Sequence, residues 1–318
     1  MNEELIRRIM QESLGVIPLS VTRFAAGLAN YVYLVQDQEE KFVVRCSPEE
    51  NSYDKTNRLL RKLGGIGIPV PEIIAQGCKE GYTYLILTYL EGEELGECYQ
   101  HLTKVDKQTI AKEIIRIQRT VAEKLEENAG KDWAWNSFAR ESLDWAEGLI
   151  RTGGYFDPEK VERIRAELPG MEPYFTSVKP IPYLDDVTTK NLLIRNGHVS
   201  GVIDVDWIGI GDMLTFVALT YVALLNMDQD TDYVDFLLEE LHADEEQRRA
   251  FLFYALIYCV DFMGERGTTF TGRTVEVNDT IIHRLNQIYD HLWERWKQSG
   301  PDRSTTYLAR SENHDSGK

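Results

Sequence analysis

The sequence predicts an α+β fold with two lobes, in which a small antiparallel β-rich lobe with one helix precedes a larger, mainly helical lobe. Short β-rich runs separated by turn residues fill residues 20–89, and one helical segment interrupts them. Helical periodicity dominates the chain after residue 103. A length of 318 residues is too long for one ordinary compact core and suits two lobes.

The first lobe is expected at residues 1–91. Residues 1–15 read as an amphipathic helix, and the apolar spacing of Leu59, Leu60 and Leu63 predicts a second helix. The β-rich runs that predict strands are 20–24, 31–35, 41–46, 73–77 and 82–89. The Gly- and Pro-rich stretch at 64–71 ends the helix before the last two strands.

The second lobe is expected at residues 92–300, after an acidic segment at 91–97 whose two glycines indicate a linker or hinge. The predicted helices are 110–125, 136–150, 158–168, 214–227, 233–241, 245–263 and 277–298. Residues 181–212 interrupt them with short β-rich runs. Residues 301–318 are polar and lack periodicity, so we expect a disordered tail.

The composition argues against nucleic-acid and membrane partners. The chain has 35 Lys and Arg against 52 Asp and Glu, a net charge of −17, which repels polyanions. No apolar run is long enough to cross a bilayer, and the N-terminus lacks the pattern of a signal peptide. The four cysteines are not spaced as metal ligands or redox pairs. A cytoplasmic protein is expected, and its oligomeric state stays open.

The most informative segment is 180–212. Asp186 lies five residues before Asn191, a β-rich run follows, Asn196-Gly197 forms a hairpin turn, and a second run leads to Asp204. A hairpin with this turn brings Asn191 and Asp204 to the same end. Phosphoryl transfer needs two oxygen ligands for magnesium and a carboxylate that accepts the hydroxyl proton. Asn191 and Asp204 suit the metal, and Asp186 suits the base.

Here the chain resembles the aminoglycoside phosphotransferase and choline kinase-like family, which has a protein-kinase-like bilobal fold. The run 184–191 resembles its His-Gly-Asp-x-x-x-x-Asn motif, and 201–207 resembles its Gly-Val-Ile-Asp-Trp-Glu motif. Further resemblances in the expected order are Gly27-Leu28-Ala29-Asn30, Phe42-Val43-Val44-Arg45, Ile68-Pro69-Val70-Pro71, Leu85 to Gly92, and Gly209 to Asp212.

The resemblance implies a kinase that moves the γ-phosphate of ATP to a hydroxyl of a small molecule, with Mg2+ as the metal ion. The residues that it assigns to the nucleotide are Gly27, Asn30, Arg45, Thr88 and Leu90. Asp186 takes the catalytic position, and Asn191 and Asp204 take the metal positions. Asp212 resembles a structural residue that caps the following helix, and Asp206 either lines the substrate side or caps a turn.

Four positions depart from the family pattern. The motif His is Leu184, the motif Gly is Asp185, and the phosphate-contacting Lys is Arg45. The helix Glu expected to pair with that cation falls near Thr56, which leaves two nearby acids, Asp54 and Glu50, as alternative partners.

These departures keep a nucleotide-binding pseudokinase or scaffold open as an alternative. A protein kinase is a second alternative, disfavoured by Thr188 at the loop-Lys position and by the absence of an Ala-Pro-Glu sequence after Asp204. For the acceptor, the acidic stretches at 91–97, 228–235 and 239–246 favour an amine-bearing alcohol such as an aminoglycoside. Acidity that serves only solubility is the competing interpretation.

Overall fold

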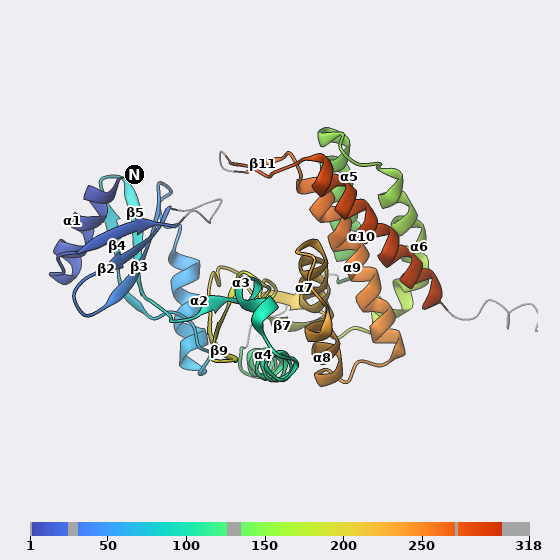
Figure 1. Ribbon diagram of the computed structural model, residues 1–318, viewed down its shortest axis with the longest axis horizontal. Helices are drawn as coiled ribbons and strands as arrows, with labels where there is room; N and C mark the ends of the chain where they lie inside the picture. Colours follow the sequence, from blue (N-terminus) through green and yellow to red (C-terminus); the bar gives the residue numbers. More distant parts are fainter. Residues whose placement is uncertain (1, 25–30, 126–134, 271–272, 301–318) are drawn as a thin grey trace, which may run out of the picture.

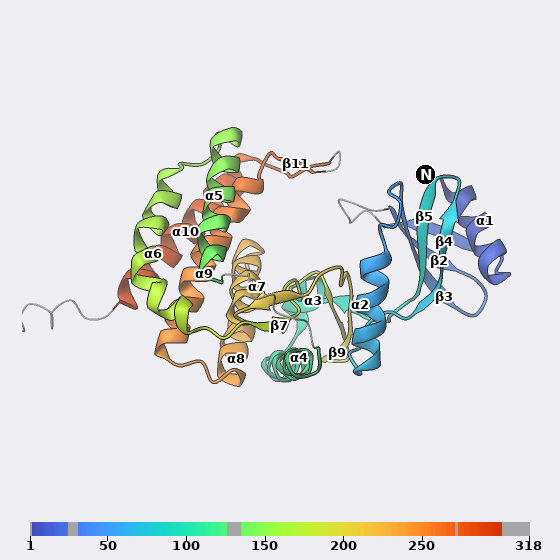
Figure 2. The ribbon, with the colours of Figure 1, turned by 180° about the vertical axis from the view of Figure 1, so that it is seen from behind.

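The computed structural model describes residues 2–24, 31–125, 135–270 and 273–300. Figure 1 shows a β-sheet with two helices at one end of the molecule and a group of long helices at the other. A middle part lies between them, and the view from behind agrees (Figure 2). It contains α4 (Lys104–Lys124) and the strands β7 (Ile181–Tyr183), β8 (Leu192–Arg195) and β9 (His198–Val202). Gly27, Asn30 and the expected tail at 301–318 lie outside the described residues.

The sheet at one end is antiparallel and has the strand order β1-β2-β3-β5-β4. Its strands are β1 (Ser20–Arg23), β2 (Tyr31–Gln36), β3 (Lys41–Ser47), β4 (Ile73–Lys79) and β5 (Tyr82–Thr88). Arg45 on β3 is in register with Val32 on β2 and with Leu85 on β5. It therefore lies on the central strand, with a paired neighbour on each side.

Each face of the sheet carries one helix. The face that bears Phe42 and Val44 shares a core with α1 (Glu3–Leu14), which buries Leu5, Ile6, Ile9 and Met10 against it. Successive side chains of a strand point to opposite faces, so Val43 and Arg45 face the other way. That second face carries α2 (Asp54–Gly65), whose leucines share the main core with Leu85 and Leu87 on β5.

The middle of the molecule contains the segment that the sequence singled out. β8 (Leu192–Arg195) pairs with β9 (His198–Val202) on one side and with β6 (Glu93–Glu94) on the other. β7 (Ile181–Tyr183) pairs with β10 (Gly209–Gly211). The expected linker at 91–97 is therefore not free: it supplies a strand of this sheet and the start of α3 (Leu95–Cys98), followed by a 3-10 turn at Tyr99–His101. Two-residue strands are too short to give a periodic signal.

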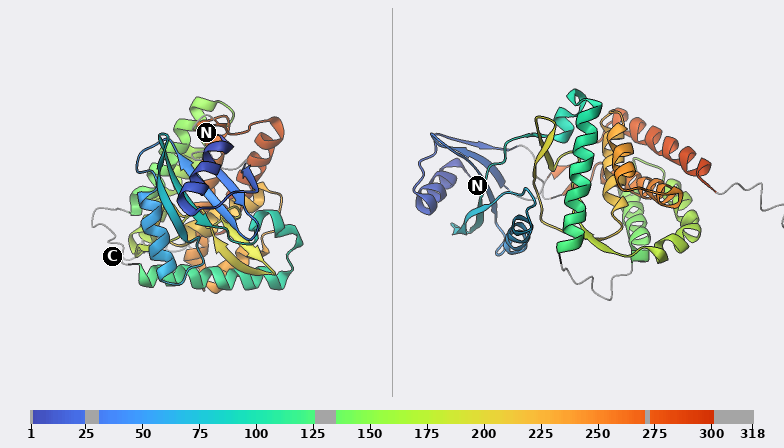
Figure 3. Two further views of the ribbon diagram at one scale, coloured as in Figure 1. Left: turned by 90° about the vertical axis from the view of Figure 1, so that its left-hand side faces the viewer. Right: turned by 90° about the horizontal axis from the view of Figure 1, so that it is seen from below.

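Seven longer helices form most of the rest of the described fold: α4 (Lys104–Lys124), α5 (Trp135–Gly153), α6 (Glu159–Ser177), α7 (Leu214–Asn226), α8 (Asp232–Glu240), α9 (Glu245–Glu265) and α10 (Asp279–Gln298). α9 has buried residues on all sides because α5, α6, α7 and α10 contact it. Seen from below, α4 stands between the sheet and the helices beyond it (Figure 3). Within the described residues, none of the helices combines the length and apolar character that a bilayer crossing needs.

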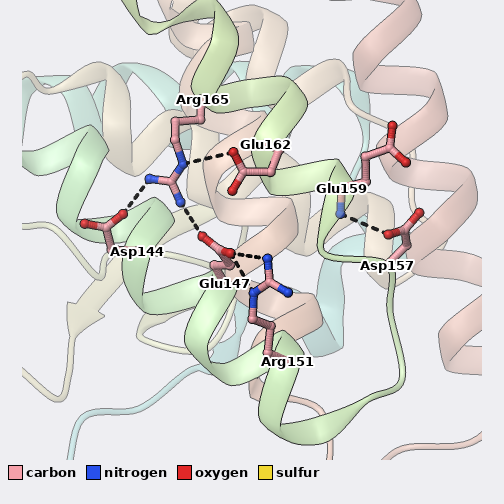
Figure 4. A network of polar contacts seen from close by, with 7 residues as sticks. All are labelled: Asp144, Glu147, Arg151, Asp157, Glu159, Glu162 and Arg165. Atoms are coloured by element: carbon pink, nitrogen blue, oxygen red, sulfur yellow. Dashed lines mark hydrogen bonds and ion pairs between the residues drawn. The ribbon is translucent and has the colours of Figure 1, made fainter.

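The sequence-based end of α6 was wrong. The helix continues to Ser177 although Pro169 and Pro173 lie inside it, because tertiary packing of its buried face holds it in place. Charged residues link it to α5: Arg165 bonds Asp144 at 2.5 Å and Glu147 at 2.6 Å, and Glu147 also pairs with Arg151 (Figure 4). A short hairpin of β11 (Thr269–Phe270) and β12 (Arg273–Thr274) connects α9 to α10.

Candidate active site

The β8–β9 hairpin brings the two predicted metal-binding residues together. Asn196 and Gly197 at its turn have positive φ angles of 53° and 76°, as a type I′ turn requires. At the open end, the backbone N–H of Ile203 donates to the carbonyl of Asn191 at 2.9 Å. Asn191 immediately precedes one strand and Asp204 closely follows the other, so thirteen residues of sequence become a short distance in space.

Asp186 lies beside Asn191, as the spacing predicts. The amide Nδ2 of Asn191 donates to the Asp186 carbonyl at 3.0 Å and to Oδ2 at 2.9 Å, and the Thr188 hydroxyl lies 3.4 Å from Oδ1. Burial raises the pKa of Asp186 to about 6, and the charges of Asp185 and Asp204 add to the increase. The side-chain hydrogen bonds from Thr188 and Asn191 act to lower this pKa. Asp186 is therefore a carboxylate whose pKa lies close to neutrality, as suits a proton acceptor.

Asp204 has an unusual backbone. Its φ angle of +56° is in the left-handed region, which non-glycine residues seldom occupy and which Asp tolerates better than most. Burial raises the pKa of its carboxyl, while Arg45 acts to lower it and Asp206 to raise it. A backbone held in this conformation at a cluster of acids is typical of a functional site.

Arg45 reaches this cluster from the sheet. Its Nη2 lies 2.7 Å from Asp206 Oδ2 and 3.3 Å from Asp204 Oδ1, and its Nη1 lies 3.2 Å from Asp206 Oδ1. The residue is only 8% exposed. Burial by itself lowers the pKa of Arg45, but the charges of Asp206 and Asp204 outweigh it and the pKa lies above its ordinary value. The guanidinium is therefore held beside the predicted metal position.

The prediction that Asp54 or Glu50 pairs with Arg45 was wrong. The carboxylates that contact it are Asp206 and Asp204, and neither Asp54 nor Glu50 is among its described contacts. Thr56, which stands where a helix carboxylate was expected, donates its hydroxyl to Asp206 Oδ1 at 2.6 Å. The sequence left the role of Asp206 open between two other interpretations. Its spacing of two from Asp204 was the one available signal that both acids serve the same site.

A cavity of about 280 Å³ lies at this cluster. It is lined by Leu184, Asp185, Asp186, Val187 and the run from Val202 to Trp207. The Trp207 side chain is exposed, and the Lys55 ammonium lies 3.1 Å from its ring centroid. A larger cavity, of about 430 Å³, includes Phe42, Ile74 and Thr88. Since Phe42 faces away from Arg45, that space is separate from the acidic cluster.

Gln118 on α4 holds the loop that carries Asp186, and the sequence interpretation missed it. The side chain is fully buried, accepts a hydrogen bond from the Leu184 N–H at 2.8 Å and donates to the Leu184 carbonyl at 2.7 Å. Leu184 is itself buried at the position of the family's motif His. The available signal was a lone amide within the apolar stripe of α4, at the helical spacing of Ile114 and Val121.

The two predicted hinge residues use their side chains within the protein. The Thr88 hydroxyl accepts the N–H of Glu72 at 2.9 Å, and its own N–H donates to the Glu72 carbonyl at 3.0 Å. Leu90 packs against Gly201 so closely that a Cβ there would lie 2.5 Å from Leu90 Cδ1.

Asp212 has the structural role that the sequence indicated. Its Oδ1 accepts the N–H of Leu214 at 2.9 Å in the first turn of α7. Its Oδ2 accepts the hydroxyls of Tyr174 at 2.6 Å and Tyr254 at 3.1 Å. Burial raises the pKa of this carboxyl, and the three hydrogen bonds act in the opposite direction. Asp212 thus ties α7 to α6 and α9 behind the acidic cluster.

A model of the phosphotransferase enzyme family matches residues 20–252, which include both the sheet and the acidic cluster. The chain belongs to the phosphotransferase enzyme family. This confirms the predicted family and enzyme class, a small-molecule kinase, and the protein-kinase alternative falls away. A search of curated protein sequences finds no match.

Solved structures of phosphotransferases share the fold. A thermostable mutant of aminoglycoside phosphotransferase APH(4)-Ia with ADP and hygromycin B has 14% identity and a TM-score of 0.64, over 93% of this chain and 98% of that chain. ADP-bound APH(2″)-Ib has 14% identity and a TM-score of 0.65, over 93% and 99%. The streptomycin–ATP–APH(2″)-IIa complex has 14% identity and a TM-score of 0.62, over 94% and 98%. The predicted protein-kinase-like fold is confirmed.

Proposed function

We propose that this phosphotransferase moves the γ-phosphate of ATP to a hydroxyl group of a small molecule. ATP would lie between a nucleotide-binding lobe at residues 1–91 and a catalytic lobe at 92–300, with the hinge at Thr88 and Leu90 beside it, and Gly27 and Asn30 would be among the residues that bind it. The observation that carries the proposal is the convergence of Arg45, Asp186, Asn191 and Asp204 on one cluster of contacts.

In the proposed reaction, Asp186 accepts the proton of the acceptor hydroxyl and orients its oxygen toward the γ-phosphorus. A new oxygen–phosphorus bond forms, the bond between that phosphorus and the β,γ-bridging oxygen breaks, and ADP leaves with the bond's electron pair. Arg45 neutralises phosphate charge. There is little covalent work for the protein, so the rate comes from positioning and from charge stabilisation.

The donor groups fit magnesium. Asn191 uses its amide nitrogen on Asp186, which leaves its Oδ1 for a metal ion, and Asp204 adds an anionic oxygen. The described residues contain no group of three or more His, Cys, Asp or Glu that could hold a metal alone. Magnesium in nucleotide sites is usually held by one or two carboxylates together with phosphate oxygens, and it would neutralise charge on the phosphates.

For the acceptor, we propose an amine-bearing alcohol. Asp261 and Glu265 on α9 are partly buried, and both Asp261 and Asp185 act electrostatically on Tyr258. Acids that reach from α9 toward the loop before Asp186 would attract a cation to that side of the loop. Structures with the same fold include complexes with hygromycin B, streptomycin and gentamicin, which are the acceptor type that this acidity favours.

The test is a phosphorylation screen of aminoglycosides, amino sugars, choline-like amines and neutral sugars with magnesium and ATP. We expect transfer to at least one amine-bearing alcohol. Asp186→Asn should lower turnover about 10²–10⁴-fold, the usual contribution of a general base, with ATP binding nearly unchanged. Wild-type turnover by Asp186→Asn would refute the assignment of the base. ATP binding without transfer to any alcohol would instead support the nucleotide-binding scaffold.

A further inference from the structure

Three segments far apart in the sequence meet at Asp206. Arg45 comes from the central strand β3, Thr56 from the first turn of α2, and Asp206 from the segment after β9. The guanidinium bonds both oxygens of the Asp206 carboxylate, at 3.2 and 2.7 Å, and the Thr56 hydroxyl bonds one of them at 2.6 Å. A two-bond arrangement of this kind fixes the orientation of an Arg side chain as well as its position.

The direction in which Arg45 points depends on this contact. Its Nε is buried and has no hydrogen-bond partner among the described residues. The Tyr53 side chain also contacts the guanidinium, with its ring centroid 5.5 Å from Cζ, but it is uncharged and cannot supply the opposing charge that a carboxylate does. Its other carboxylate neighbour, Asp204, lies farther away, at 3.3 Å, and through a single nitrogen. Without Asp206, Arg45 would turn to Asp204 and occupy the carboxylate that the proposed magnesium site needs.

Thr56 fixes the carboxylate in turn. The residue is 3% exposed and its hydroxyl donates to the Asp206 oxygen that Arg45 Nη1 also contacts. The preceding residue makes a parallel contact, since the Lys55 ammonium covers the ring of Trp207. Two consecutive residues of α2 therefore contact two consecutive residues of the segment after β9.

We propose that Asp206 is a positioning residue that takes the place of a helix carboxylate: it orients Arg45 for the nucleotide phosphates, and Thr56 holds it in that role. The inference rests on the proposed function. It differs from a pairing within the β-rich lobe, because the orienting carboxylate comes from the segment that carries Asp204. The position of the phosphate-binding cation is thereby coupled to the position of the metal-binding carboxylate.

Moving the carboxylate from position 206 to position 56 tests the proposal. Asp206→Ala should weaken binding of the magnesium–ATP complex at least about tenfold, the effect of losing one charge-assisted hydrogen bond, measured by calorimetry without an acceptor. Adding Thr56→Glu to Asp206→Ala places a longer acidic side chain where it can reach the vacated position beside Arg45. We expect this double variant to recover affinity to within about threefold of the unaltered protein, since the lost fold-change is mostly restored.

The matched control is Thr56→Gln with Asp206→Ala, which has the same shape without the charge and should not recover affinity. Unchanged binding by Asp206→Ala would overturn the proposal. Equal affinity of the Glu and Gln double variants would also overturn it. That result is expected if Asp206 is a metal ligand, because a carboxylate at position 56 of α2 can pair with Arg45 but cannot replace a metal ligand beside Asp204.

A milder pair of variants covers the case in which Asp206→Ala fails to fold. Thr56→Val removes the hydroxyl and should weaken magnesium–ATP binding, whereas Thr56→Ser keeps the hydroxyl and should not. Equal affinity of the two would contradict the role of Thr56. If the unaltered protein binds no magnesium–ATP, the proposed function fails. The contact is then tested by a double-mutant cycle of Arg45→Met and Asp206→Ala in unfolding free energy, where zero coupling would overturn it.

Discussion

The acids at this site lie where their charged forms are disfavoured, although Asp186 and Asp204 remain partly accessible to solvent. Asp185, Asp186 and Asp204 all have raised pKa values because burial disfavours their charged forms, and Asp186 reaches about 6. Arg45 opposes the effect at Asp204. Carboxyls with perturbed pKa values that lie this close together suit a site that receives a metal cation.

At the residue scale, Asp204 carries a direct prediction. Asp204→Asn should remove most of the magnesium dependence of ATP binding, because a hard divalent ion needs an anionic oxygen and Asn191 supplies a neutral one. Asn is preferred to Ala because it tolerates the positive φ at this position. Calorimetry with and without magnesium measures the effect. Equal affinity of the variant and the unaltered protein for magnesium–ATP would show that Asp204 is not a ligand.

At the scale of elements, α4 supports the loop of Asp186 through Gln118. Gln118→Met keeps the size of the side chain and removes both hydrogen bonds to Leu184. Two buried backbone groups lose their partners, so we expect a loss in unfolding free energy of about 1–3 kcal/mol for each group. The turnover number should fall while the affinity for ATP stays near normal. Arg116→Met on the exposed side of the same helix is the control. Equal losses of unfolding free energy and turnover in both variants would contradict the role of Gln118.

Helix α9 carries a prediction about pH. Burial raises the pKa of Asp261 to about 7, with Glu265 adding to the increase. Its pKa in the unfolded chain is lower, so this carboxyl favours folding when neutral and progressively destabilises the fold as the pH rises toward 7. Asp261→Asn should therefore raise the unfolding free energy at pH 8 by at least about 1 kcal/mol, since one pKa unit corresponds to about 1.4 kcal/mol.

The control is the same measurement at pH 4, where the Asp261 carboxyl is protonated in the folded protein and the substitution should change little. Thermal unfolding at the two pH values separates these outcomes. A gain of equal size at both would show that the effect is not the ionisation of Asp261.

At the scale of the whole molecule, the charge of −17 predicts how acceptors are captured. A negative cleft raises the local concentration of cations, and salt weakens this effect. We expect the kcat/KM of an amine-bearing acceptor to fall as ionic strength rises, and that of a matched neutral alcohol to stay nearly constant. A neutral acceptor used best, with no dependence on salt, would refute the electrostatic argument and leave the kinase assignment intact.

The sequence by itself determined the fold class and most of its elements. The strands at 20–24 and 41–46 and the helix at 245–263 were predicted because each has a strong local signal, either alternation with turn residues or apolar spacing. The Asn-Gly turn was enough to predict that Asn191 and Asp204 would meet. Local patterns failed where packing dominates: α6 continues through two prolines, and 93–94 forms a strand only because β8 lies beside it.

Only the tertiary structure decided which side chains act together across long distances in the chain. Arg45 was predicted to point at phosphate, but its pairing with Asp206, and the part of Thr56 in it, follow from how α2 and the segment after β9 pack. Gln118 and Leu184 are likewise joined by the placement of α4. A local pattern records what a residue's neighbours along the chain require. A contact between residues more than sixty positions apart depends on the whole packing, which no window of sequence contains.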